Sequence, residues 1–305
     1  MLLGMSNFLV VMISMIGVAF FIVVERKGLG MFQLRQGPNK VGFKGLFQPV
    51  ADGVKLFSKE MSVPFSGSQS LYLLGPVVCF FLSYVVWIIS PTQFWLVRFP
   101  LSVLFLLCVS STHVFGTFLV GWTVDSRYAM LGAMRGVAQT ISYEVVFSGV
   151  ILCPLLFVGT FDLLEMRASN VFLLLFCLEV FLVWLVVLLA ELNRAPFDFV
   201  EGESELVAGY MVEYGGLGFA LIALAEYGNI FFMSMVSSAI FLSSFFGSMG
   251  LMLLSFWAVS ISYAIVGVRG SMPRFRYDLL MCFCWQKLLP LVLGSLVFYM
   301  SLLYS

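Results

Sequence analysis

Long stretches of apolar residues recur along the whole of this chain, and they restrict its fold more than any other feature. A membrane-spanning helix requires about 20 predominantly apolar residues, and these stretches reach that length. The chain is also 61% hydrophobic and only 10% charged, whereas a soluble globular protein carries about 25% charged residues. We therefore expect an all-α integral membrane protein, and the composition excludes a soluble globular class.

The apolar stretches predict eight transmembrane helices in a single polytopic membrane domain, residues 1–305. The uncharged run 227–268 is too long to complete one helix, so a seventh helix is placed inside it. The N-terminal stretch has no basic region before it and no clear small-residue cleavage site, so we expect a spanning helix rather than a signal peptide. The predicted helices are approximately 2–24, 69–90, 100–123, 137–159, 169–190, 214–240, 245–267 and 288–303.

The basic residues are distributed unequally between the two sides of this topology. Fourteen of the sixteen Lys and Arg residues fall in the loops after the odd-numbered helices, which are 25–67, 124–136, 191–213 and 268–287. Only Arg98 and Arg167 fall on the other side. Because Lys and Arg accumulate on the cytoplasmic or matrix face, we expect the odd-numbered loops there and both termini on the opposite side.

The first of these loops contains a different kind of helix. Between Gly45 and Phe57 the apolar residues recur at steps of three and four, whereas Asp52 and Lys55 lie mostly off that stripe. The pattern is typical of an amphipathic helix on a membrane surface.

Carboxylates are concentrated in one segment, 191–213, which we call the acidic loop. It holds six of the sixteen acidic residues against one base, Arg194. Carboxylates held together repel one another and titrate as a coupled set, as a proton relay or a redox-linked charge switch requires. A solvated acidic bend is the alternative. The six acids are Glu191, Asp198, Glu201, Glu203, Glu205 and Glu213.

Two further acids, Glu144 and Glu226, lie inside predicted spans. An acid within a membrane is costly and indicates a functional site, here a proton carrier. The alternative is a buried acid paired with Arg127, Arg135 or Arg194.

Residues that hold metals are scarce in the chain. The six cysteines form no CxxC motif, and His113 is the only histidine, which excludes ligation by histidine pairs and argues against an iron–sulfur cluster. We expect no redox cofactor in this chain, and we interpret His113 as a packing or hydrogen-bonding residue.

Several motifs together resemble one family across essentially the whole chain. They are ERK at 25–27, QLRQGPNKVG, QPVADGVKLFSKE, ISYEV around Glu144, AELNRAPFDFVEGESELVAGYMVEYGG, AEYGNI around Glu226, and MPRFRYD at 272–278. In this order they are similar to the chain 1 family of NADH–ubiquinone oxidoreductase, the quinone-pocket membrane subunit of respiratory complex I. The compact loops resemble a mitochondrially encoded member. Glu179 departs from the family pattern, so no role is assigned to it.

The resemblance implies a subunit of the mitochondrial inner membrane that forms the ubiquinone channel and couples quinone reduction to proton translocation. It implies matrix-side odd-numbered loops, termini on the intermembrane side, and ubiquinone as the substrate. NADH, FMN and the iron–sulfur clusters would belong to partner subunits, one of them an iron–sulfur subunit docked on the matrix side. The other implied partners are neighbouring membrane subunits and lipids, with no nucleic acid.

The resemblance and the residue types together indicate two sets of site residues. The proton-carrying set is Glu144, Glu191, Asp198, Glu201, Glu203, Glu205, Glu213 and Glu226. The quinone-binding set is Glu25, Arg26, Arg35, Asp52, Lys55, Arg194, Phe219, Arg274, Arg276 and Asp278. Arginine suits such a site because it stays charged and donates in a fixed fork. For the basic residues, the alternative is that they only follow the positive-inside pattern.

Three other functions remain open at this point. A hydrogenase-related complex would use a similar membrane anchor but would bind nickel-containing subunits. A proton- or cation-coupled transporter would explain the intramembrane acids, yet no inverted repeat is visible. A structural scaffold would tolerate neutral replacements of Glu144 and Glu226.

Overall fold

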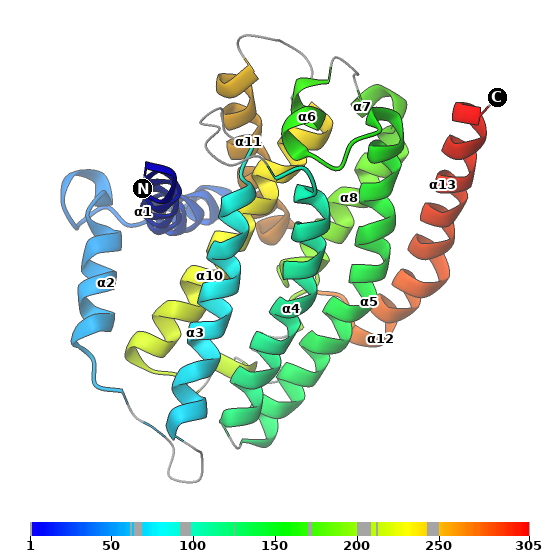
Figure 1. Ribbon diagram of the computed structural model, residues 1–305. Helices are drawn as coiled ribbons and strands as arrows, with labels where there is room; N and C mark the ends of the chain where they lie inside the picture. The colour runs from blue at the N-terminus through cyan, green and yellow to red at the C-terminus, as the bar shows by residue number, and fades with distance from the viewer. Residues whose placement is uncertain are drawn as a thin grey trace.

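The computed structural model describes residues 2–61, 63, 69–91, 99–124, 126–169, 173–199, 209–211, 213–242 and 250–304. In these residues the regular structure is helical and contains no β-strand (Figure 1). The predicted all-α class is therefore confirmed for the described part of the chain. Glu201, Glu203 and Glu205 lie outside the described residues.

Seven described helices are long and apolar enough to cross a membrane. The elements that form them are α1 (Leu2–Phe32), α3 (Gln69–Val85) with the 3₁₀ turn Val86–Ile89, α4 (Ser102–Thr123), α5 (Arg127–Val158), α10 (Gly216–Ser237) with the π-helical turn Ser238–Leu242, α11 (Gly250–Ser271), and α12 (Tyr277–Phe283) continued through the π-helical turn Cys284–Leu288 into α13 (Leu289–Tyr304). The shorter elements are the 3₁₀ turn Phe43–Gly45, α2 (Gln48–Ser58), α6 (Leu163–Ala168), α7 (Leu173–Phe176), α8 (Leu178–Glu191) and the 3₁₀ turn Gly209–Met211.

The stretch predicted as the fifth span is divided between α7 and α8, because a turn at Cys177 separates them. α8 alone has 14 residues, which gives about 21 Å at about 1.5 Å per residue. The hydrocarbon core of a bilayer is about 30 Å thick. No single helix of the described residues therefore matches the predicted fifth span.

Several helices run further than the apolar stretch that predicted them. α5 begins at Arg127, ten residues before the predicted start at 137, and Ser126 caps it by accepting a hydrogen bond from the Ala129 amide at 3.3 Å. α1 continues past Val24 to Phe32. Hydropathy marks the apolar part of a helix, whereas backbone hydrogen bonds and caps set its ends.

The helices pack into a bundle in which glycine allows close approach. α4 lies between α3 and α5, and α5 also packs against α8 and α13. A Cβ atom added at Gly121 of α4 would meet Ala133 of α5, and one added at Gly116 would meet Cys79 of α3 at 2.8 Å. Small residues at such contacts let membrane helices approach closely.

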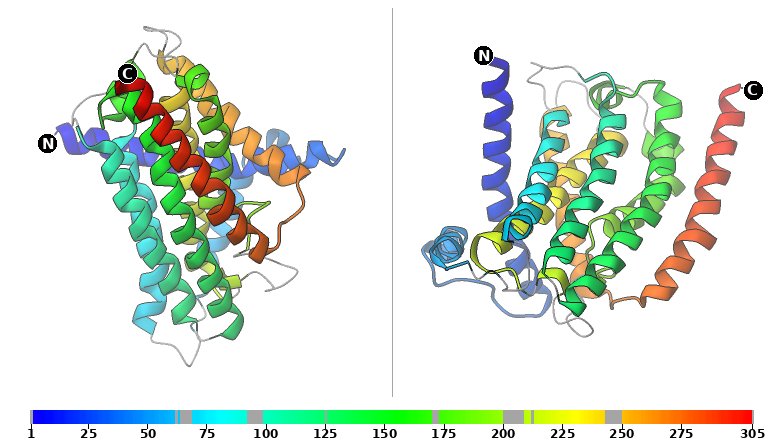
Figure 2. Two further views of the ribbon diagram at one scale, coloured as in Figure 1. Left: turned by 90° about the vertical axis from the view of Figure 1, so that its right-hand side faces the viewer. Right: turned by 60° about the horizontal axis from the view of Figure 1, so that its bottom comes forward.

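Two helices differ in direction from the rest of the bundle. α1 is seen nearly end-on in Figure 1, where α3, α4 and α5 run along the page, and it packs against α10 and α11 (Figures 1 and 2). In the right-hand view of Figure 2 the spans run up the page while α2 is seen end-on beside them.

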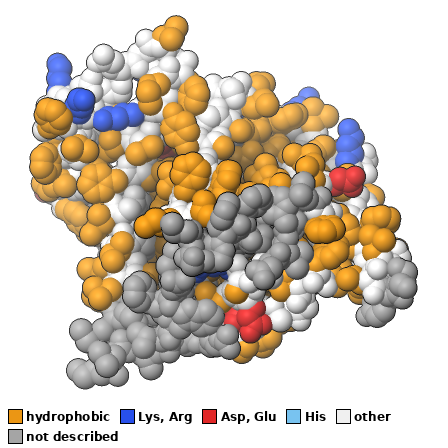
Figure 3. Space-filling model, turned by 90° about the horizontal axis from the view of Figure 1, so that it is seen from above, with side chains coloured by type: hydrophobic (Ala, Val, Ile, Leu, Met, Phe, Trp, Pro, Cys, Tyr) orange, Lys and Arg blue, Asp and Glu red, His pale blue; other side chains and the backbone are white. Residues whose placement is uncertain are grey.

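The two ends of the molecule also differ. The N- and C-terminal ends both lie at the top of the right-hand view of Figure 2, on opposite sides of the bundle. The end that carries α6 and α7 shows mostly hydrophobic side chains with few charged ones among them (Figure 3). The acidic loop begins at the end of α8, beside the start of α12, at the opposite end of the bundle (Figures 1 and 2).

Candidate functional site

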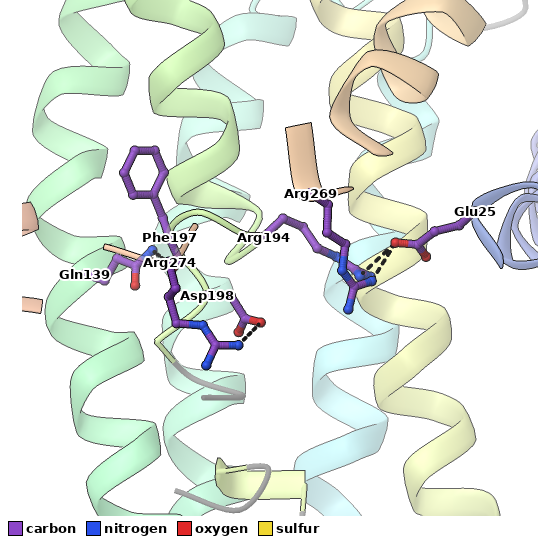
Figure 4. Close-up of polar contacts among 7 residues, drawn as sticks. All are labelled: Glu25, Gln139, Arg194, Phe197, Asp198, Arg269 and Arg274. Carbon is purple, nitrogen blue, oxygen red and sulfur yellow. Dashed lines mark hydrogen bonds and ion pairs between the residues drawn. The ribbon is translucent and has the colours of Figure 1, made fainter. Parts of the chain in front are cut away.

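A buried carboxylate on α1, Glu25, lies between two arginines from distant parts of the chain. Its Oε1 atom is 2.6 Å from Nη1 of Arg269 on α11 and 3.4 Å from Nη1 of Arg194 in the acidic loop (Figure 4). The guanidinium of Arg194 also lies over the ring of Tyr227 on α10, 4.4 Å from the ring centroid. We call Glu25, Arg194, Arg269 and Tyr227 the Glu25 cluster.

The Glu25 cluster is buried at its centre and opens at Arg269, whose side chain is 31% exposed. The side chains of Glu25 and Arg194 are only 6% and 8% exposed. The Glu25 carboxylate faces the Arg194 and Arg269 guanidinium groups. The Tyr227 ring adds a cation–π contact to Arg194. The cluster therefore joins α1, the acidic loop, α10 and α11 through charged contacts inside the bundle.

A second ion pair links the acidic loop to the segment between α11 and α12. Asp198 Oδ2 is 3.4 Å from Arg274 Nη2, and their side chains are 8% and 32% exposed. The Phe275 amide donates to the Pro196 carbonyl at 3.1 Å, and the Phe197 and Phe275 rings stack with centroids 5.7 Å apart. Because three independent contacts join the two segments, Arg274 is held beside the loop.

Gln139 of α5 holds the start of the acidic loop in place. It is fully buried, and its Nε2 atom donates to the carbonyls of Ala190 at 2.9 Å and Phe197 at 3.0 Å (Figure 4). Sequence reasoning missed this residue, although the signal was present: an amide side chain within an otherwise apolar span is itself costly and indicates a specific partner.

The far end of the loop is anchored by tyrosines. The Tyr72 hydroxyl donates to the Glu213 carbonyl at 2.9 Å, and the Tyr72 ring stacks on Tyr214 with centroids 4.4 Å apart. Burial raises the pKa of Tyr214 to about 12. The phenol, which is protonated near neutral pH as any tyrosine is, donates to the Val120 carbonyl at 3.2 Å.

The intramembrane acids have specific neighbours. Glu144 lies within electrostatic reach of Glu191, the last residue of α8, and hydrogen-bonds Ser111 of α4. Glu226 of α10 accepts a hydrogen bond from the Tyr210 hydroxyl at 2.6 Å. The fold thus brings Glu144 and Glu191 together and pairs Glu226 with a phenol.

The remaining predicted quinone-binding residues lie on the surface. Arg26 Nη1 is 2.6 Å from Asp52 Oδ2, which joins α1 to α2, and their side chains are 50% and 35% exposed. Arg276 and Asp278 form a more exposed pair, with Nε and Oδ2 3.0 Å apart. Arg35, Lys55 and Phe219 are also exposed. The structure therefore divides the predicted set into buried members (Glu25, Arg194), a half-buried member (Arg274) and surface members.

Comparison with known proteins identifies the family of the chain. A family model described as NADH dehydrogenase matches residues 5–300. Two relatives named NADH-ubiquinone oxidoreductase chain 1, from Aedes aegypti and Anopheles gambiae, are 46% and 47% identical, and each alignment covers 97% of this chain and 94% of the relative. A relative of the same name from Artemia franciscana is 45% identical over 97% of both chains. The chain therefore belongs to the NADH-ubiquinone oxidoreductase chain 1 family.

Proposed function

We propose that the chain is the membrane subunit of a proton-translocating NADH:ubiquinone oxidoreductase, respiratory complex I, and that it forms the ubiquinone-binding channel. The observation that carries this proposal is the meeting of α1, the acidic loop, α11 and the segment before α12 around buried arginine–carboxylate pairs. The common name of the relatives favours this function over a transporter or a hydrogenase anchor.

The three arginines of these pairs suit a quinone headgroup. A quinone presents two carbonyl oxygens, and reduction to the quinol takes up two electrons and two protons. Arg194, Arg269 and Arg274 remain charged and donate in a planar fork, which polarises a carbonyl oxygen and stabilises charge that develops on it. The electrons come from iron–sulfur chemistry in a partner subunit, which itself receives them from NADH through FMN.

The carboxylates suit the proton half of the reaction. Glu191 marks the start of the acidic loop and lies within electrostatic reach of Glu144 inside the bundle. Glu226 is linked through Tyr210 to the end of the same loop. These neighbours support a relay in which a charge change at the quinone site alters the protonation of acids in the membrane interior.

The topology belongs to the same proposal. α7 and α8 together form a broken fifth span, which restores eight crossings and places both termini on the intermembrane side. The concentration of basic residues in the odd-numbered loops supports this orientation. α2 is a surface helix: it lies across the direction of the spans in Figure 2, and its apolar residues Val50, Val54 and Phe57 are exposed.

The matrix-side surface is where partner subunits dock. The exposed pair Arg276–Asp278 and the basic residues of the first loop offer charges for that contact. The lipid-facing helices meet membrane lipids and neighbouring membrane subunits of the inner mitochondrial membrane.

The test is a comparison of two arginines two residues apart. In the assembled complex, Arg274→Ala removes an ion-pair partner of buried Asp198, whereas Arg276→Ala removes a side chain that is 78% exposed. We expect Arg274→Ala to lower NADH:ubiquinone reductase activity about tenfold, as loss of about 1.4 kcal/mol of transition-state stabilisation would, and Arg276→Ala to leave it near wild type. NADH oxidation by an artificial acceptor that does not use the quinone site should be unchanged in both variants. Equal quinone reductase activity in the two variants would contradict the proposal.

A further inference from the structure

A small polar cavity lies inside the bundle, apart from the Glu25 cluster and from the Asp198–Arg274 pair. It is enclosed by α3, α4, the C-terminal end of α8 and α10, and it has a volume of about 50 Å³. Its polar lining residues are Ser110 and His113 of α4, Glu191 of α8 and Asn229 of α10. Apolar side chains such as Val86 and Phe232 form the rest of the wall.

Glu191 has a hydrogen-bonding capacity that the described residues leave unused. Its Oε2 atom is buried, and no hydrogen-bond partner for it is present among the described residues. A buried polar atom left unpaired costs about 1–3 kcal/mol, and more when it is charged. Because Glu191 lines the cavity, a small hydrogen-bond donor there would satisfy this oxygen.

His113 and Asn229 form a polar pair on the same cavity. Asn229 Nδ2 lies 3.3 Å from His113 Nε2. An amide NH₂ group only donates, so in this arrangement Nε2 accepts and the neutral imidazole carries its proton on Nδ1. The prediction that His113 is a hydrogen-bonding residue is confirmed by this contact. The pair also retains capacity for a further ligand, since the Asn229 amide has a second N–H and an acceptor oxygen.

The size and polarity of the cavity match water. A buried water needs about 10–15 Å³ of such space and two to four polar partners. The cavity offers that space several times over, with a hydroxyl, an imidazole, an amide and a carboxylate around it. The cavity is too small for a larger ligand, and its four polar side chains distinguish it from a purely apolar void.

We propose that this cavity binds a small cluster of water molecules that Ser110, His113 and Asn229 hold against Glu191. The water satisfies the buried carboxylate and extends its hydrogen bonding from the acidic loop into the bundle, toward His113. In this arrangement a proton released by Glu191 passes to a water, which passes one of its own protons onward, so the water is not consumed. His113 and Asn229 are positioning residues for this water. The proton-carrying role rests on the proposed relay; the water site itself does not.

The direct test is the structure of the wild-type assembled complex, determined by electron cryo-microscopy at a resolution that shows ordered water. We expect density for water within hydrogen-bond distance of Glu191 and of Asn229 or His113. A cavity filled by a side chain, by a lipid chain or by no density would overturn the proposal.

Variants test the role of the water. Asn229→Leu and His113→Phe replace polar lining groups by apolar ones, His113→Gln restores a polar group, and Met233→Leu is the control because Met233 is an apolar residue of the same wall. We expect Asn229→Leu and His113→Phe to lose the water density and to lower the number of protons translocated per NADH, while quinone reduction continues. His113→Gln and Met233→Leu should retain both. Retained translocation in a variant that has lost the water would overturn the role of the water.

Glu191→Gln separates this inference from the proposed relay. Loss of translocation in Glu191→Gln, together with a dry cavity in the wild type, would leave the relay intact and reject the water site. Full translocation in Glu191→Gln, with ordered water in the wild type, would reject Glu191 as a carrier and with it the proton-carrying role of the water, but would leave the water site itself intact.

Discussion

The buried and the exposed ion pairs of this protein use the same residue types and are separated by only a few residues in sequence. Glu25 and Arg26 are adjacent, yet Glu25 is 6% exposed between two arginines whereas Arg26 is 50% exposed and pairs with Asp52 on the surface. Arg274 and Arg276 show the same contrast, at 32% and 78% exposure. In each case a more exposed residue follows the more buried one within two positions, so burial rather than sequence position separates the two kinds of pair.

Burial changes how much stability depends on a charge pair. An exposed pair contributes about 0–1 kcal/mol, since water and salt screen it. Removing one member of a buried pair costs about 3–5 kcal/mol, because the other charge is left without compensation. The buried pairs therefore fix the positions of segments that are far apart in sequence, while the surface pairs leave their side chains available for partner subunits.

The largest effect is expected for Glu25→Ala. The substitution leaves Arg194 and Arg269 facing one another without the carboxylate between them, and we expect a loss of about 3–5 kcal/mol. The measurement is thermal stability and the amount of assembled complex on a blue-native gel. Asp52→Ala is the matched control, because Asp52 is a half-exposed acid with an arginine partner. Similar losses in the two variants would remove the distinction between the pairs.

A smaller effect is expected for Tyr210→Phe, because Tyr210 is a neutral hydrogen-bond donor to the acid Glu226. Tyr210→Phe removes the hydroxyl that donates to Glu226 at 2.6 Å, and hydrogen bonds to charged groups contribute about 1.5–3 kcal/mol. We expect lower proton translocation per NADH in Tyr210→Phe and a larger loss in Glu226→Gln and Glu201→Gln, with each complex fully assembled. Full translocation and turnover in both carboxylate variants would show that the acidic loop is only a solvated bend.

Gln139→Leu should disturb the start of the acidic loop without altering any charge. The carbonyls of Ala190 and Phe197 each lose one donor and keep a backbone donor, the amides of Asn193 and Phe199. Each lost hydrogen bond then costs about 0.5–1.5 kcal/mol. The expected result is reduced thermal stability with a raised KM for ubiquinone, because Asp198 follows Phe197 directly. Gln139→Met, which keeps the length of the side chain and its neutrality but has no donor, should reproduce the defect if donation is the cause.

The smallest effect is expected for Arg26→Ala. Because the Arg26–Asp52 pair is half-exposed, the stability of the complex should change by about 1 kcal/mol or less. The same measurement at high salt should reduce the difference further, since screening weakens exposed pairs. A loss as large as that of Glu25→Ala would show that a partner subunit buries this pair in the complex.

Residue types alone supplied the candidate residues of the site. Glu144 and Glu226 attracted attention because charged residues in apolar spans are costly, and the acidic loop was visible as a local excess of carboxylates. The partners of these acids were not predictable. Arg269 lies 244 residues from Glu25, and no local pattern indicates which of the fourteen loop bases meets a given acid. Gln139 was missed for the same reason, because its two acceptors are backbone atoms that only the fold brings to it.

The predicted fifth span shows what hydropathy cannot predict. Hydropathy predicted one helix at 169–190, because nearly every residue of that segment is apolar. The exceptions are Ser169, Asn170 and Glu179. Hydropathy does not report backbone geometry, and the turn at Cys177 divides that segment into α7 and α8. The start of α5 at Arg127 has a similar explanation, since a cap rather than an apolar residue begins that helix.

By itself the sequence determined the membrane class, the approximate positions of the spans, the unequal distribution of charge and the family, because each of these depends on composition or on local order along the chain. Only the tertiary structure decided which charges are buried, which acids lie near one another, and where polar space remains inside the bundle. Those properties depend on the distances between helices that are remote in sequence, and a carboxylate changes its chemistry according to what surrounds it.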